Sequence, residues 1–177
     1  DGTFKIPSDA DSSGVINISG NDDKKVEFSM VDDSNTSIIN KEITVNYSDS
    51  GNKVVFPAGT KITGPIGWNG EMSLPKIETI PTITPSVSGY SVNVLQTITI
   101  GDEGNFTFDK PVHLIFNGQA GKRVGFIKGD PLTFTEIEAC DGTNNIPEGR
   151  QDCKYDLGLN LIVLTKHFTE FVVFTAT

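Results

Sequence analysis

Hydrophobic and polar residues alternate with a period of two along much of the chain. Val26 and Phe28 follow this pattern, and so do Ile43, Val45 and Tyr47. Successive side chains of a strand point to opposite faces of a sheet, so this period predicts strands with one buried face. The 18 Gly and 9 Pro residues are spread along the chain, and such residues separate short strands. The pattern therefore predicts an all-β chain.

Three segments carry more specific information about the expected strands. Residues 75–85 contain three prolines, and since proline cannot donate to a central ladder, this segment is expected at a sheet edge. Asn117-Gly118 is expected to close a hairpin. The stretch from Leu159 onwards lacks Gly and Pro and is apolar on both faces, which predicts a central, buried strand pair. The other expected strands are Val26–Val31, Ile43–Tyr47, Lys53–Phe56, Val92–Ile100, Phe106–Phe108, Val112–Phe116, Val124–Ile127 and Leu132–Ile137.

These segments predict an antiparallel β-sandwich of about a dozen short strands in a single compact domain, residues 21–177. Residues 1–20 hold two short apolar pieces separated by a polar, acidic loop. They are expected to form an N-terminal arm or an edge strand. Because an unpaired strand edge is a template for another chain, this arm could add to a neighbouring copy.

Charge argues against one class of partner, and hydropathy argues against a membrane span. The formal net charge is −9, whereas binding to a phosphate backbone depends on Lys and Arg displacing counterions. Nucleic acid is therefore not an expected partner. No apolar run approaches the roughly 20 residues that a membrane-spanning helix needs, so we expect no transmembrane segment.

The two cysteines, Cys140 and Cys153, are separated by a stretch rich in turn-forming residues. A disulfide between them would close a short loop and stabilise the fold by about 3 kcal/mol on the chain-entropy model. Such bonds persist in oxidising compartments, which predicts an extracellular or cell-surface location. The alternative is a pair of free thiols. Zinc binding together with His113 and His167 is disfavoured, because the paired short spacings of zinc sites are missing.

The strongest chemical motif is His167-Phe168-Thr169, within the apolar stretch 161–174. It resembles the end of the GAIN domains of adhesion receptors, where a histidine, an apolar residue and a hydroxyl residue precede the last strand. The resemblance implies autoproteolysis between Phe168 and Thr169. His167 would act as general base, and the Thr169 hydroxyl would attack the Phe168 carbonyl to give an ester that water opens.

A second, wider likeness implies a structural role for the same residues. It is carried by the segments Val54–Thr60, Trp68–Gly70, Gly118–Gly125 and Thr165–Phe171. Together they resemble ZU-type-like β-sandwich modules of large bacterial and archaeal surface proteins, which commonly close on a His-Phe-Ser/Thr strand. In that reading His167 caps a turn, while Phe168 and Phe171 fill the core.

The N-terminal acidic loop resembles part of a calcium-binding loop. Position 6 of the pattern is a glycine, but position 12, where a bidentate acid belongs, is Gly20. A carboxylate from elsewhere would have to complete the site. The alternative is a solvated acidic turn. The candidate ligands, at positions 1, 3, 5 and 9, are Asp9, Asp11, Ser13 and Asn17.

Trp68 lies among glycines and a proline and could offer an exposed ring to a sugar. This reading predicts a carbohydrate-binding adhesin module, and the alternative is a ring tucked under its own turn. Taken together, the sequence favours a non-enzymatic extracellular module of a cell-surface or filament protein. Its expected partners are other copies of itself or other surface proteins.

Overall fold

Strands and turns make up the chain wherever its structure is described. The computed structural model describes residues 3–6, 14–17, 25–28, 30–31, 35–47, 51–101, 105–142 and 144–177. These residues form seventeen strands and no helix, so the all-β prediction is confirmed. Accordingly, the described part of the chain contains no helix that is long and apolar enough to cross a membrane.

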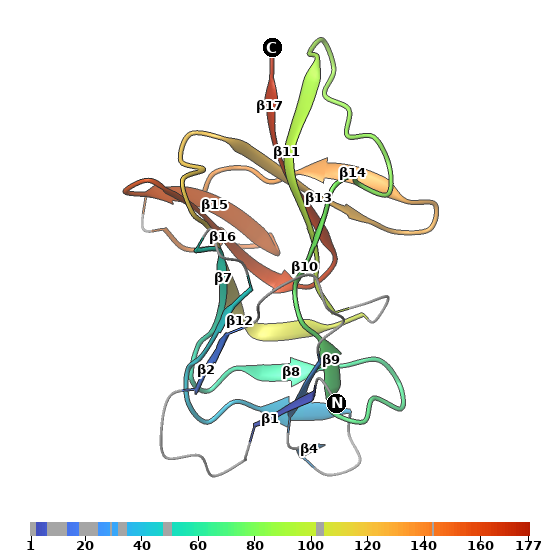
Figure 1. Ribbon diagram of the computed structural model, residues 1–177, viewed down its shortest axis with the longest axis vertical. Coiled ribbons are helices and arrows are strands. Elements are labelled where there is room, and N and C mark those ends of the chain that lie inside the picture. Colours follow the sequence, from blue (N-terminus) through green and yellow to red (C-terminus); the bar gives the residue numbers. More distant parts are fainter. Residues whose placement is uncertain are drawn as a thin grey trace.

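The strands belong to three sheets (Figure 1). The small sheet contains β1 (Thr3–Ile6), β3 (Lys25–Phe28) and β9 (Glu71–Ser73), in that order. The second sheet has the order β10 (Lys76–Glu78), β11 (Val92–Thr99), β17 (Glu170–Ala176), β13 (Arg123–Lys128) and β14 (Thr133–Glu136). The main sheet contains β2 (Gly14–Asn17), β6 (Ile43–Asn46), β7 (Lys53–Phe56), β12 (Thr107–Phe116), β8 (Lys61–Thr63), β5 (Thr36–Ile38), β4 (Met30–Val31), β16 (Asn160–His167) and β15 (Asp152–Leu157).

Strand β12 organises the main sheet, because one of its sides carries two different neighbours. Its first residues pair with β8, and residues 113–115 pair with β7. On its other side β12 pairs with β16, with a register shift between Thr107 and Val112. Pro111 lies within that shift, where a residue without an N–H removes no ladder bond.

The hydrophobic core lies where the sheets meet. One cluster of buried side chains draws on all three sheets, including Val26, Leu114 and Val173. Strands β6 and β7 show the alternation of buried and half-buried residues that their sequences predict. A smaller cluster is formed by Cys153 of β15 and by Ile162 and Leu164 of β16. The fold is therefore sandwich-like, with the core between stacked sheets.

Both strands of the N-terminal segment lie at sheet ends. β1 pairs with β3 and β2 pairs with β6, each in parallel register. Strand β10, within the proline-rich segment, is one of the two edge strands of the second sheet, as expected.

Two expectations about connections are wrong. Asn117-Gly118 does not close a hairpin, because β12 lies in the main sheet and β13 in the second sheet. Likewise β16 and β17 are buried as expected, but they pair with different strands and do not form a pair with each other. Both turns carry the chain from one sheet to the other.

The close approach of β13 and β14 gives a test of the packing in the second sheet. A Cβ at Gly125 would collide with the Phe134 ring and lie 2.6 Å from the backbone oxygen of Thr135. We expect Gly125→Ala to lower the free energy of unfolding by about 1–3 kcal/mol, because over-packing forces side chains or backbone to move. Urea unfolding measures this change. Gly142→Ala is the control, because nothing lies within 4 Å of that Cβ, and equal losses in the two variants would contradict the prediction.

Candidate functional site

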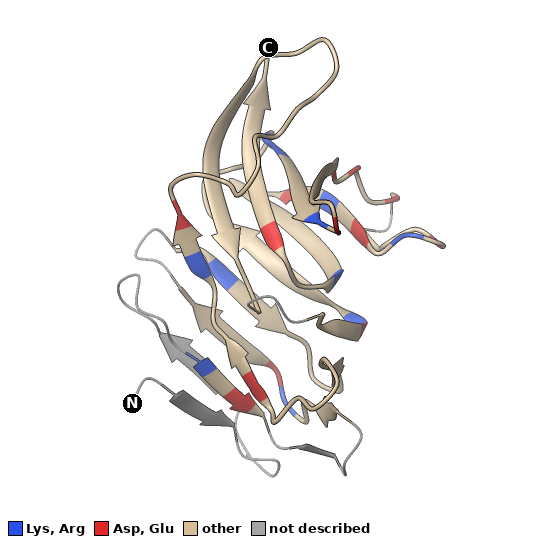
Figure 2. Cartoon of the chain, turned by 90° about the vertical axis from the view of Figure 1, so that its right-hand side faces the viewer, with Lys and Arg blue, Asp and Glu red and all other residues tan. Residues whose placement is uncertain are grey.

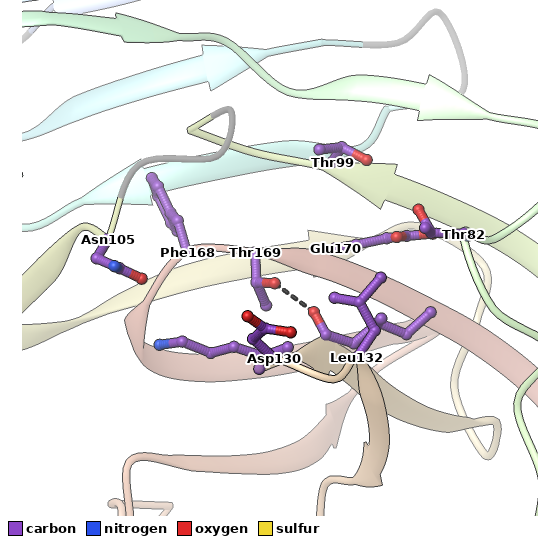
Figure 3. Close-up of a pocket in the computed structure, with 11 residues that line it drawn as sticks. Thr82, Thr99, Asn105, Asp130, Leu132, Phe168, Thr169 and Glu170 are labelled. Atoms are coloured by element: carbon purple, nitrogen blue, oxygen red, sulfur yellow. Dashed lines mark hydrogen bonds between the residues drawn. The ribbon is translucent and has the colours of Figure 1, made fainter.

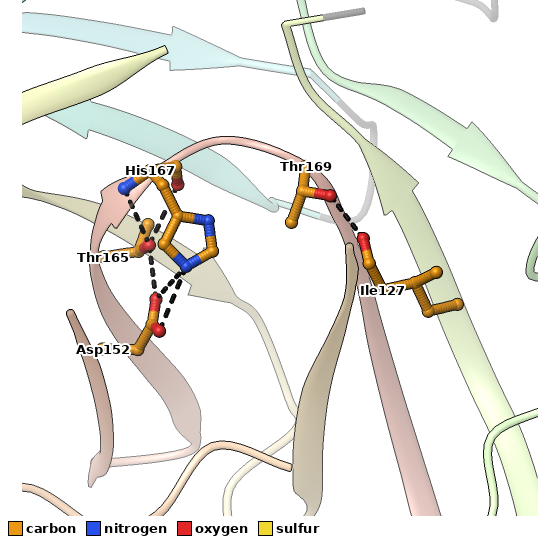
Figure 4. A network of polar contacts seen from close by, with 5 residues as sticks. All are labelled: Ile127, Asp152, Thr165, His167 and Thr169. Carbon is orange, nitrogen blue, oxygen red and sulfur yellow. Dashed lines mark hydrogen bonds and ion pairs between the residues drawn. The ribbon is translucent and has the colours of Figure 1, made fainter. Parts of the chain in front are cut away.

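The site predicted from sequence is a corner of the fold. Strand β16 ends at His167 in the main sheet, and β17 begins at Glu170 in the second sheet. Only Phe168 and Thr169 lie between them, so the chain changes sheets within two residues (Figure 4). Long apolar strands on both sides fix the position of this short link, and we call residues 167–170 the corner.

Phe168 points into the core and anchors the corner. Its side chain is buried, and its ring centroid lies 5.7 Å from that of Phe56 and 4.6 Å from that of Phe108. The Phe56 ring in turn contacts Phe28. Edge-to-face aromatic pairs of this kind stabilise a core beyond their buried area. Phe168 therefore fills the core, as the ZU-type resemblance implies.

His167 is held by a carboxylate from the neighbouring strand. Its Nε2 lies 2.9 Å from Oδ1 and 3.1 Å from Oδ2 of Asp152, and the two side chains are only 7% and 10% exposed. Asp152 starts β15 and lies opposite Thr165 in the ladder with β16. The Thr165 hydroxyl lies 2.6 Å from Oδ1 of Asp152 and 2.9 Å from the backbone oxygen of His167. A buried carboxylate is thus paired with two donors, as burial of charge requires.

The surroundings of the imidazole fix its orientation. The ring packs edge-on against Phe126, with centroids 4.8 Å apart, and is stacked 6.0 Å from Phe171. The contact with Asp152 assigns a hydrogen to Nε2, which leaves a lone pair on Nδ1 in the neutral ring. Nδ1 is buried and has no hydrogen-bond partner among the described residues. A base held in one tautomer by a carboxylate is one element of a catalytic site.

The proposed nucleophile, however, is engaged elsewhere. The Thr169 hydroxyl donates a hydrogen bond to the backbone oxygen of Ile127 on β13. Figure 4 shows this hydroxyl directed away from the imidazole of His167. The backbone oxygen of Thr169 accepts a hydrogen bond of 3.2 Å from Ile100 N–H. The structure brings His167 and Thr169 to the same corner, but it gives their polar atoms separate partners.

Two pockets flank the corner. The first, of about 710 Å³, is lined by Thr169, Glu170 and residues of the β13–β14 turn, including Asp130 (Figure 3). Oε1 of the buried Glu170 accepts a hydrogen bond of 2.7 Å from the backbone N–H of Thr82. The second pocket, of about 500 Å³, is lined by Asp152 and His167 together with residues of β13 and β14. Among the described residues that line these pockets, none has a hydroxyl that forms a hydrogen bond with the imidazole nitrogens of His167.

The predicted disulfide is confirmed and lies beside this site. Cys140 and Cys153 are bonded, and Cys153 is fully buried on β15. The backbone N–H of Cys140 donates to the oxygen of Lys154, and the N–H of Lys154 donates to the oxygen of Glu138. The bond therefore clamps the segment after β14 against β15, next to Asp152. Sequence reasoning missed Asp152 as the partner of His167, although its place beside Cys153 was a usable signal.

The Trp68 ring lies inside the molecule. It is only 8% exposed and packs against Phe28 and Phe106, at centroid distances of 6.3 and 5.3 Å. Its Nε1 donates to the backbone oxygen of Glu71 over 2.6 Å. Because the ring is buried and its polar atom is engaged, it offers no platform to a sugar. This placement argues against the carbohydrate-binding role.

The predicted calcium ligands Asp9, Asp11 and Ser13 lie outside the described residues. Asn17 ends β2, where only the backbone is described. Elsewhere in the part of the chain that the structure covers, no cluster of three or more His, Cys, Asp or Glu side chains could hold a metal ion. Calcium binding by the N-terminal loop stays a prediction.

The buried contact between Asp152 and His167 can be tested by stability. We expect Asp152→Ala to lower the free energy of unfolding by about 2–4 kcal/mol, because it leaves His167 Nε2 buried without its acceptor, whereas the Thr165 hydroxyl can still donate to the backbone oxygen of His167. Chemical unfolding gives the value. Glu138→Ala is the control, since the Glu138 side chain is 80% exposed and its pairing with Arg150 spans 3.6 Å. Exposed pairs contribute little, so similar losses in the two variants would contradict the buried-pair account.

Comparison of the chain with protein-family models, with curated proteins and with solved structures finds no significant match. The likeness to ZU-type modules and to GAIN domains therefore rests on the residues that carry it.

Proposed function

We propose that this chain is a non-enzymatic, extracellular structural module of a cell-surface or filament protein. An all-β body and a disulfide between Cys140 and Cys153 support this proposal. Disulfides of this kind persist outside the reducing cytosol. A net charge of −9 favours protein partners over nucleic acid.

One observation carries the structural reading: each chemically capable side chain at the corner has a packing or hydrogen-bonding role. Asp152 binds His167, Thr169 binds Ile127, and Phe168 fills the core. The contacts of His167 and Phe168 are with strands of the main sheet, and that of Thr169 is with β13 of the second sheet, so together they fix the corner to both sheets where the chain crosses between them. A reaction at this corner would have to break at least one of these contacts.

The expected partners are other copies of the chain or other surface proteins. Strands β1, β2, β10 and β14 lie at the ends of their sheets, and sheet edges are the surfaces through which β-modules assemble by strand addition. Calcium, if bound by the acidic N-terminal loop, would stabilise the arm from which such addition was predicted.

Self-processing is the second candidate function, and one observation favours it. His167 is oriented by Asp152, its Nδ1 has no partner among described groups, and it precedes Thr169 by two residues. In this reaction the Thr169 hydroxyl leaves Ile127, loses its proton to His167 and attacks the carbonyl carbon of Phe168. The peptide C–N bond then breaks to give an ester and a free Thr169 amine. Water hydrolyses the ester and leaves a carboxylate on Phe168.

The contribution of the disulfide to stability can be tested directly. We expect reduction of the bond, or the double variant Cys140→Ala/Cys153→Ala, to lower the free energy of unfolding by about 3 kcal/mol, because the bond restricts a short loop in the unfolded chain. Unfolding of oxidised and reduced protein measures the difference. A reducing agent should leave the double variant unchanged. Equal stability of oxidised and reduced wild-type protein would contradict a stabilising role for the bond.

Intact mass under denaturing conditions separates the two functions. The structural module predicts one species of 19.1 kDa, lighter by two hydrogens until it is reduced. Self-processing predicts loss of residues 169–177, abolished in Thr169→Ala and retained in Thr169→Ser, which keeps a hydroxyl nucleophile. A fragment with that dependence would overturn the structural proposal, and a fragment also present in Thr169→Ala would indicate cleavage by another protease.

A further inference from the structure

One long segment of the chain carries no charge. Asp, Glu, Lys, Arg and His are all absent from residues 79–101, although charged residues make up 21% of the chain. The segment includes β11 and the connection that leads into it from β10. Figure 2 shows this end of the molecule, around β11 and the C-terminus, as mostly free of charged residues. Charged side chains of other strands contact the segment at two points: Arg123 lies over the Tyr90 ring at 5.4 Å, and Glu170 accepts a hydrogen bond from Thr82. In an acidic protein, the absence of charge from the segment itself needs an explanation.

Strand β11 has an open edge within this segment. It pairs with β17 along its whole length, but β10 covers only its last residues, Thr97–Thr99. Ser91 and Thr177 exchange two backbone hydrogen bonds, of 2.8 and 3.0 Å. Hydrogen-bonded and non-bonded pairs alternate along an antiparallel ladder, so the N–H and C=O groups of Val92 and Val94 point away from β17. Within the described residues, no hydrogen bond reaches these groups.

The connection before β11 leaves this edge uncovered by backbone pairing. After Glu78 it departs from the ladder with β11, and the N–H of Thr82 is held by Glu170. Pro85 is buried, so the connection packs against the body of the molecule. It returns through a tight turn closed by the Val87–Tyr90 bridge.

The open edge lacks most of the devices that keep sheet edges apart. Native edges are usually protected by charged side chains, proline, bulges or a covering segment. Residues 91–96 contain neither charge nor proline, and their bulge leaves Leu95 42% exposed. Tyr90 and Ile80 nearby are 56% and 77% exposed. Exposed apolar side chains beside free backbone groups mark a surface for another strand.

We propose that the edge of β11, residues 91–96, pairs in antiparallel register with the same edge of a second copy of this chain. Two copies, each with a net charge of −9, repel one another wherever their acidic surfaces meet. The uncharged segment avoids that repulsion and therefore favours a second copy as the occupant. An antiparallel edge meeting itself about a two-fold axis is also a closed arrangement, which gives a dimer.

The short length of the open β11 edge limits the strength of the contact between two copies. At one end it is limited by β10, and at the other by the Val87–Tyr90 turn. A ladder of so few residues makes a small interface, and small interfaces are weak. Such a contact forms at the high local concentration of a surface layer or filament. The inference rests on the proposed function and specifies one of its assembly surfaces.

Analytical ultracentrifugation up to about 1 mM protein tests the proposal, because association this weak is visible only at high concentration. We expect the wild type to show a monomer–dimer equilibrium. The double variant Asn93→Lys/Leu95→Lys should weaken dimerisation about tenfold or more, because like charges would face each other across the two-fold axis. A monomer at every concentration overturns the proposal, and so does a dimer of unchanged affinity in the variant, which would point to the N-terminal arm or another face.

Leu159→Lys is the matched control. Leu159 is 79% exposed on the β15–β16 turn, so its substitution also replaces an exposed leucine by lysine, but away from β11. It should leave the dimerisation constant unchanged, and an equal loss of affinity in this control overturns the assignment to the β11 edge.

Amide hydrogen exchange of the wild type keeps the test independent of whether the double variant folds. In the dimer, exchange at Val92 and Val94 should slow as protein concentration rises, while exchange at Ser91 should not depend on concentration. Concentration-independent exchange at Val92 and Val94 in a protein that dimerises overturns the proposal. The proposed function is tested by intact mass, whereas edge pairing is tested by dimerisation and amide exchange. Failure of edge pairing and failure of the proposed function are therefore distinguishable.

Discussion

The passage of the chain between two sheets within Phe168 and Thr169 is the constraint on which the rest of the structure depends. Strand β17 lies between β11 and β13, and β16 lies between β12 and β15. The corner therefore ties together the central strands of both larger sheets. Phe168 fixes its depth in the core, the Thr169 hydroxyl fixes it to β13, and His167 fixes it to β15. If the corner moved, both sheets would lose register.

The contact between His167 and Asp152 depends in turn on how β15 is held. β15 is joined to β16 by a ladder on one side and to the segment before Cys140 by hydrogen bonds and the disulfide on the other. With its position fixed from both sides, Asp152 keeps two donors close without further rearrangement. Preorganisation of this kind makes a buried carboxylate tolerable, since the hydrogen bonds replace the water it has lost. The same rigidity opposes self-processing, because the Thr169 hydroxyl would have to exchange partners inside a tightly held corner.

Local sequence patterns predicted the strands that have a regular period and a buried face. They did not predict features that depend on which distant strands become neighbours. Alternation identified β6 and β7, and the uninterrupted apolar stretch identified β16 and β17. The short strands β8 and β9 were missed because three residues do not establish a period. The disulfide was predicted from the spacing of the two cysteines.

The pairing of His167 with Asp152, and of Thr169 with Ile127, could not be predicted, since it depends on which strands become neighbours. Asn117-Gly118 shows the same limit, because a turn signal does not say whether the two strands it joins share a sheet.

Charge distribution links the fold to assembly more directly than any single side chain does. Where the body of the protein meets water, charges of both signs occur, as in the pairing of Arg123 with Glu136 on β13 and β14. This pair lies at one margin of the second sheet. At the other margin β10 carries Lys76 and Glu78, whose side chains pair at 3.8 Å, but the part of β11 that β10 leaves open carries no charge. Charge protects sheet edges against pairing, and this open part lacks it. Under the proposed edge pairing, a second copy would cover the open part of β11, and any longer assembly would use other surfaces of the molecule.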